Sequence, residues 1–192
     1  MKKLIPMMAL LAFQGCSAAA IADGRRILKE VVVKAPVEDV WKAWSTSEGI
    51  QSFFAPEAVV DPRPDGAFDV RMNPYAQAGN RGADGMRVLG VQPQRMITFS
   101  WNAPPHLPEA RAQRTFVAVR MNPVSATETR VALSHDGWGD GGQWDQAYDY
   151  FDKAWGNVLG SLQKRFVEGP RDWKEWLARM RAFQDEEDRK KR

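Results

Sequence analysis

A histidine close to two carboxylates is the group of side chains in this sequence best suited to chemistry. His135 is followed directly by Asp136, and Asp140 comes a few residues later. An imidazole beside a carboxylate can accept a proton from a bound molecule, so this cluster predicts a general base. The alternative, which we favour, is structural: His135 satisfies the end of a strand and Asp140 caps the helix that follows.

The sequence provides little for metal or cofactor chemistry. His106 and His135 are its only histidines, and they lack the spacing of metal ligands. Its single cysteine is Cys16. No glycine-rich phosphate loop follows a strand, and no nucleophile elbow is present. We therefore expect no metal site and no cofactor.

A long amphipathic helix is predicted for residues 142–169. Apolar residues recur there at alternating steps of four and three, which places them on one face of a helix. This apolar stripe consists of Trp144, Tyr148, Phe151, Trp155, Val158, Leu162 and Phe166. A stripe of this width must be buried, so the helix is the body against which a sheet should pack.

Most of the chain between residues 27 and 138 reads as short strands separated by turns, an antiparallel meander. Pro36 suits the first turn of a helix, and helical spacing over 37–44 and an apolar piece at 50–54 predict two short helices after the first strand. Residues 73–84 and the proline-rich stretch 104–108 read as loops. In the last three strands, alternation directs one side inward. The inward residues are Ile97, Phe99, Trp101, Val117, Val119, Met121, Val131, Leu133 and His135.

A second amphipathic helix should follow the first. Gly169 and Pro170 end the long helix, after which apolar residues recur at helical spacing over 173–183. The chain then finishes in a solvated charge run at 185–192. The polar face of this second helix mixes both signs of charge, so it should pack on the domain or on a second copy of the chain, as a homodimer, rather than lie on a membrane.

The first residues have the layout of an export signal. Lys2 and Lys3 precede an apolar run at 4–13, and small residues stand at Ala20 and Ala22. Release after Ala22 would give a periplasmic or secreted protein. In the alternative route, lipoprotein processing leaves an acylated Cys16 as a membrane anchor. Three segments result: the signal at 1–22, one domain at 23–169, and a C-terminal helix with a charged tail at 170–192.

The charge of the chain speaks against a nucleic-acid partner. The 192 residues carry a formal net charge of +3. Removal of the predicted signal, with its two lysines and no acidic residue, leaves about +1. No basic face with interleaved aromatic residues accompanies this charge.

Several segments, in order, resemble the SRPBCC (START-like, helix-grip) superfamily and, within it, homologues of the activator of heat-shock-protein-90 ATPase. The segments are 35–44, 65–68, 85–89, 93–101, 129–138 and 155–162, and the resemblance covers about residues 27–167. It implies an α+β helix-grip fold, in which a curved antiparallel sheet wraps around a long C-terminal helix and leaves an apolar cavity. An exported protein would not meet a cytosolic chaperone, so the name of the family does not supply the function.

Three functions are compatible with these features. The first is binding of a small apolar or aromatic molecule in a cavity between the sheet and the N-terminal part of the long helix. The ligand-binding residues would be Phe99, Trp101, Trp138, Trp144, Tyr148, Phe151 and Trp155. The second is a cyclase-like or hydrolase-like enzyme, with His135 as base and Asp136 or Asp140 orienting it. The third is a protein-interaction module that uses residues 173–183.

Overall fold

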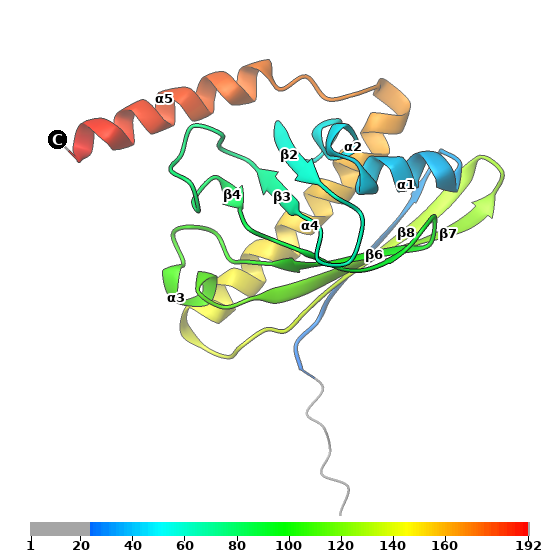
Figure 1. The fold of residues 1–192 in the computed structure, drawn as a ribbon, viewed down its shortest axis with the longest axis horizontal. Coiled ribbons are helices and arrows are strands. Elements are labelled where there is room, and N and C mark those ends of the chain that lie inside the picture. The colour runs from blue at the N-terminus through cyan, green and yellow to red at the C-terminus, as the bar shows by residue number, and fades with distance from the viewer. Residues whose placement is uncertain (1–23, 192) are drawn as a thin grey trace, which may run out of the picture.

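The computed structural model describes residues 24–191 of the chain (Figure 1). The predicted export signal and Cys16 lie outside the described residues. The helices and strands follow one another as β1 (Ile27–Val33), α1 (Val37–Ser45), α2 (Ser47–Gln51), β2 (Glu57–Val60), β3 (Phe68–Arg71), β4 (Gly82–Ala83), β5 (Val88–Gln92), β6 (Met96–Trp101), α3 (Pro108–Arg111), β7 (Thr115–Ser125), β8 (Glu128–Asp136), α4 (Gly142–Glu168) and α5 (Lys174–Lys190).

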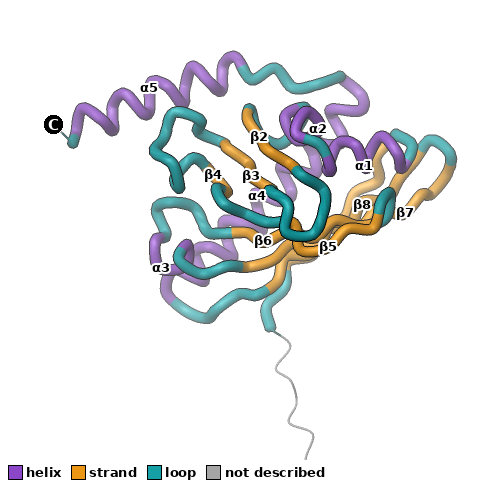
Figure 2. Tube along the Cα trace, in the orientation of Figure 1, coloured by secondary structure: helices purple, strands orange, loops and turns teal. Residues whose placement is uncertain are grey.

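The strands form two antiparallel sheets joined into one curved surface. The larger sheet has the order β1-β8-β7-β6-β5, and the smaller has the order β2-β3-β4. A bridge between Ala67 and Arg87 connects the two sheets. The short helices α1 and α2 follow β1 and pack beside β2, β7 and β8 (Figure 2). The predicted fold class, a helix-grip sheet with a long C-terminal helix and an extra helix after it, is confirmed.

The core lies between the larger sheet and α4. The predicted inward residues of the last three long strands are all buried, at most 5% exposed. From the helix, Phe151, Trp155, Leu159 and Leu162 are buried against them. Burial of this apolar surface is the main favourable term in forming the grip. Helix α4 ends at Gly169, whose φ of 96° is a conformation that glycine adopts without strain.

Several elements extend beyond the ranges that the sequence suggests. Strand β7 runs to Ser125, past an irregularity in its pairing with β8, so most of the expected connection at 122–128 is strand. The short strand β4 lies within the expected loop at 73–84, and α3 begins at Pro108, the last residue of the proline-rich stretch. Helix α5 continues through the predicted charge run, because Arg189 pairs with Glu186 and Lys190 with Glu187, one turn apart.

Two tryptophans at the start of α5 form hydrogen bonds to the rest of the domain. The indole N–H of Trp173 donates to the carbonyl of Gln51 over 2.6 Å, and that of Trp176 donates to the carbonyl of Met72 over 2.7 Å. The apolar side of this helix is therefore partly used within the chain, while Phe183 remains 55% exposed. A homodimer through residues 173–183 stays a prediction. Among residues 24–191, no helix is long and apolar enough to cross a membrane.

The buried stripe of α4 leads to a first prediction. Leu162 is 0% exposed. Its replacement by alanine removes buried apolar surface and leaves a cavity, so Leu162→Ala should lower the free energy of unfolding by about 2–5 kcal/mol. Urea denaturation followed by circular dichroism measures this change. Lys164→Ala, at an exposed position of the same helix, is the matched control and should shift the value by less than about 0.5 kcal/mol. Equal effects of the two substitutions would contradict this placement of the core.

Candidate functional site

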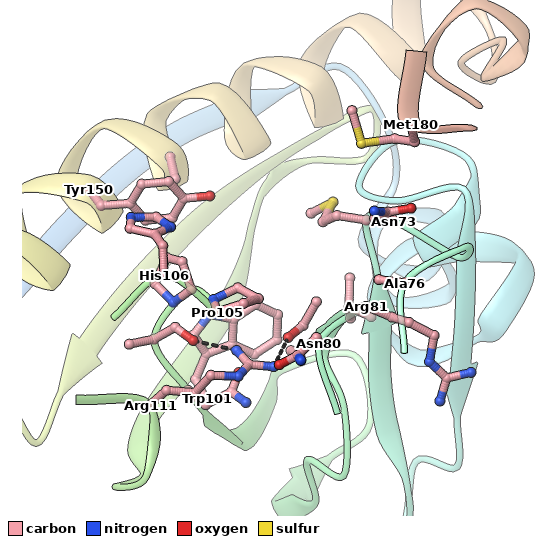
Figure 3. Close-up of a pocket in the computed structure, with 18 of the residues that line it drawn as sticks. Asn73, Ala76, Asn80, Arg81, Trp101, Pro105, His106, Arg111, Tyr150 and Met180 are labelled. Atoms are coloured by element: carbon pink, nitrogen blue, oxygen red, sulfur yellow. Dashed lines mark hydrogen bonds between the residues drawn. The ribbon is translucent and has the colours of Figure 1, made fainter. Parts of the chain in front are cut away.

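A cavity of about 610 Å³ opens beside α4. Its walls come from segments far apart in the sequence: the end of β6 with the loop after it, the 72–83 segment, the middle of α4 and the C-terminal half of α5. Figure 3 shows Tyr150 and His106 on one side of this space and Asn73, Ala76 and Met180 on the other. The volume suits a molecule of drug-like size.

The deep wall of the cavity is aromatic. Trp101 and Trp155 lie with ring centroids 5.4 Å apart, and Phe54 lies within 6 Å of both. Phe151 stacks on Trp155 at 6.0 Å. We call these four residues the aromatic floor. Because all four are at most 7% exposed and packed on one another, the floor is a preformed apolar surface.

The rim of the cavity is polar. It is formed by amides, basic groups and a few other polar side chains, namely Asn73, Gln77, Asn80, Arg81, Asn102, His106, Arg111, Tyr150, Gln184, Glu187 and Lys191. The amide of Asn73 donates to Gln184 over 3.3 Å, which connects the 72–83 segment to α5. The Tyr150 hydroxyl is a hydrogen-bond donor at neutral pH, because its ordinary pKa is 10.0 and partial burial raises that pKa further.

Arg111 holds the two loops that flank the cavity. Its guanidinium donates to the backbone carbonyls of Ala103, Gly79 and Gly82, the last over 2.8 Å. Gln143 of α4 fixes the helix that carries Arg111, because its side-chain oxygen accepts from the backbone N–H of Glu109 over 2.8 Å. Burial lowers the pKa of Arg111, as expected for a charge removed from water.

His135 lies in the core, behind the aromatic floor. It is 0% exposed and does not line the cavity. The indole N–H of Trp155 donates to His135 Nδ1 over 2.9 Å. Since an indole nitrogen can only donate, Nδ1 is unprotonated, and Nε2–H donates to Thr115 Oγ1 over 2.7 Å. Burial lowers the pKa of His135 to about 3, so the ring is neutral and both of its nitrogens are engaged.

The two carboxylates of the predicted catalytic cluster lie elsewhere. Asp136 forms an ion pair with Arg26. Asp140 has a side chain that is 99% exposed, 3.8 Å from Arg25. No side-chain hydrogen bond caps α4, so Asp140 does not act as its cap. The structure therefore does not bring the three groups together around a bound molecule, and the catalytic assignment stays a prediction.

The predicted ligand-binding aromatics divide into two groups. Trp101, Phe151 and Trp155 line the cavity. The other four lie outside its wall: Phe99 stacks on Phe68 at 3.9 Å, Trp138 donates to the carbonyl of His135, Trp144 packs beside α3, and Tyr148 donates to the carbonyl of Arg26. The cavity thus lies further along α4, away from the 135–140 loop where the sequence placed it.

Several lining residues escaped the sequence analysis because they lie in segments without periodicity. Asn102 and Arg111 follow β6 in or near the proline-rich stretch, and Asn73 and Arg81 come from the 72–83 segment. Val158 belongs to the predicted stripe of α4, and Met180 lies within the helical spacing predicted over 173–183. Among residues 24–191, no group of three or more histidine, cysteine, aspartate or glutamate side chains could hold a metal ion.

Comparison with known families identifies the fold. The family model described as "Activator of Hsp90 ATPase homolog 1-like protein" matches residues 34–166. The chain belongs to this family. The matched part contains the aromatic floor and α4 up to Phe166, and it ends before α5. A comparison with curated proteins found no significant match.

Solved structures share this family fold at low identity. A protein from Mesorhizobium loti, MLL2253, is 19% identical with a TM-score of 0.61, and the match covers 77% of this chain and 100% of that one. The Aha1 dimer from Colwellia psychrerythraea is 17% identical with a TM-score of 0.59, covering 76% and 98%. CalU16 from Micromonospora echinospora is 21% identical with a TM-score of 0.55, covering 83% of each. These likenesses show the fold alone.

The buried histidine makes the stability of this protein depend on pH. The folded-state pKa of about 3 lies below the ordinary value of 6.5. Between these values the unfolded chain binds a proton that the folded chain excludes, so stability falls as pH falls through this window. Relative to His135→Gln, which keeps a donor and an acceptor but does not titrate, the unaltered protein should lose about 2 kcal/mol more between pH 7.5 and 5. Urea denaturation at both pH values measures the difference.

A direct readout checks the same assignment without a substitution. The NMR shifts of the His135 ring should stay constant between pH 8 and 5, with the pattern of the tautomer protonated at Nε2. Titration of this ring with a midpoint near its ordinary pKa would contradict the buried, doubly engaged histidine.

Proposed function

We propose that this protein is an exported member of its family and binds a small apolar or aromatic molecule in the cavity beside α4. The observation that carries this proposal is the cavity itself, about 610 Å³ in volume with an aromatic floor and a polar rim. Binding sites for small molecules have this composition, with mostly apolar walls and few polar groups that fix orientation. The four floor residues are packed before any ligand arrives, which lowers the cost of binding.

Binding is favoured over turnover by the placement of the titratable groups. Both ring nitrogens of His135 are hydrogen-bonded, and the residue lies behind Trp155. Asp136 forms an ion pair with Arg26, and Asp140 lies 3.8 Å from Arg25. A general base must reach the proton that it removes. None of these three side chains lines the cavity.

The cavity can be tested by filling it. Ala154 of α4 lines the cavity, and tryptophan at this position would occupy the space above the floor. N-phenyl-1-naphthylamine, a neutral aromatic probe, should bind the unaltered protein, and Ala154→Trp should weaken binding at least tenfold, or about 1.4 kcal/mol. Fluorescence titration of the probe measures both affinities.

The control for this experiment lies one turn further along the same helix, outside the cavity wall. Asn157 is exposed and does not line the cavity, so Asn157→Trp should leave the affinity within twofold. Thermal unfolding confirms that both variants are folded. If the probe fails to bind the unaltered protein, or binds both variants equally well, the cavity is not the binding site and the proposal is wrong.

Export is proposed from the first residues of the sequence. When the full chain is expressed in a Gram-negative bacterium, intact mass spectrometry of the envelope fraction should show a mature protein that begins at Asp23. Cys16→Ser should then leave processing unchanged. An acylated Cys16 at the new N-terminus, lost together with membrane attachment in Cys16→Ser, would establish the lipoprotein route instead. Purified protein that retains Met1 and stays in the cytoplasm would contradict export.

A further inference from the structure

We propose that the ligand of this cavity is an apolar acid that carries a hydroxyl or amide N–H next to its acidic group. This inference rests on the proposed function and specifies the ligand class. The apolar body would lie on the aromatic floor. The acidic group would face Arg111, and the neighbouring hydroxyl or N–H would donate to Asn102.

Asn102 supplies an acceptor that nothing in the described chain satisfies. The residue is 6% exposed and lines the cavity directly after Trp101 of the floor. Its side-chain oxygen is fully buried and has no hydrogen-bond partner among residues 24–191. Buried polar atoms of this kind are rare in folded proteins. Because this oxygen has almost no accessible surface, a ligand pairs with it when the Asn102 amide turns its oxygen into the cavity.

Arg111 supplies a positive charge that no carboxylate neutralises directly. Its three hydrogen bonds go to neutral backbone carbonyls, and it forms no ion pair with a carboxylate of residues 24–191. Asp84 acts on it from a distance, but this carboxylate is engaged by Arg81 at 3.0 Å. Charge-assisted hydrogen bonds to a partly buried guanidinium are strong, so this position favours an anion.

The two groups belong to one corner of the cavity. Arg111 donates to the carbonyl of Ala103, the residue that follows Asn102. Figure 3 shows Arg111 beside Trp101, at the base of the open space. The proposed ligand, with its acid and its donor on neighbouring atoms, would contact both side chains while its apolar part covers the floor.

The other charged residues on the rim also give it a net positive charge. Lys191 also lines the cavity, as does Arg81, which pairs with Asp84 at 3.0 Å. The one carboxylate among the described lining residues, Glu187, pairs with Lys190 at 3.1 Å. An excess of positive charge around an opening attracts anions from solution and repels cations. The charge pattern thus selects an acid over an amine of the same shape.

Three matched probes separate the apolar, acidic and donor contributions. These are 3-(2-naphthyl)propanoic acid, its 2-hydroxy derivative and its methyl ester, titrated at pH 7.5 by tryptophan quenching or calorimetry. We expect the hydroxy acid to bind most tightly, followed by the plain acid, and both acids to bind at least tenfold more tightly than the ester.

Two substitutions assign these preferences to their residues. Arg111→Met should bring the affinities of the plain acid and the ester within twofold of each other. Asn102→Leu should remove the advantage of the hydroxy acid over the plain acid. Arg114→Met is the matched control, because Arg114 is exposed, does not line the cavity and contacts only backbone carbonyls of its own segment.

A second measurement does not depend on the folding of Arg111→Met. In the unaltered protein, raising NaCl from 0.05 to 0.5 M should weaken binding of the acids severalfold and leave the ester within twofold, because salt screens the charge of Arg111.

The outcomes distinguish this inference from the function on which it rests. If the ester binds as tightly as both acids, the cavity is a binding site but the acid-specific corner is wrong. If the acids bind more tightly but Arg111→Met keeps the difference, the assignment to Arg111 is wrong. If none of the three probes binds, the proposed function fails as well.

Discussion

The hydrogen bond from Trp155 to His135 is the contact on which the rest of the structure depends. It joins the middle of α4 to β8 across 2.9 Å, and neither residue is more than 1% exposed. A buried indole N–H needs an acceptor, and neutral His135 provides it. The Trp155 ring also packs against Phe54, Trp101 and Phe151, and together these four residues form the aromatic floor. One contact therefore positions the grip helix and the wall of the cavity together.

This arrangement engages both ring nitrogens of His135, the histidine that directly precedes Asp136, within the fold. A general base needs a free nitrogen and access to a ligand. In His135, Nδ1 accepts a hydrogen bond from Trp155, and Nε2–H donates one to Thr115. Burial lowers its pKa to about 3 and keeps it neutral, which is the state that both hydrogen bonds require. Protonation would turn Nδ1 from an acceptor into a donor and break the bond to Trp155.

The sequence predicted the fold well because the fold depends on periodic burial. Alternating apolar residues in the strands and the stripe of α4 each place a buried face, and the family resemblance supplied their order. The candidate site was predicted only in part. Trp101, Phe151 and Trp155 belong to the periodic core, whereas Asn102, Arg111 and the 72–83 segment reach the cavity through loop geometry that no periodicity records. The sequence also could not show that Trp138, Trp144 and Tyr148 pack near the N-terminal end of α4, outside the cavity wall.

The central claim is that a small molecule binds on the aromatic floor, between α4, the 72–83 segment and α5. The most direct test is an NMR measurement of nuclear Overhauser effects between bound N-phenyl-1-naphthylamine and the protein methyl groups. The account predicts contacts with the methyls of Ala83, Ala154 and Val158, which line the cavity. Contacts instead with Leu28 and Val32, which are exposed on β1, would place the ligand on an outer surface of the sheet and contradict the account.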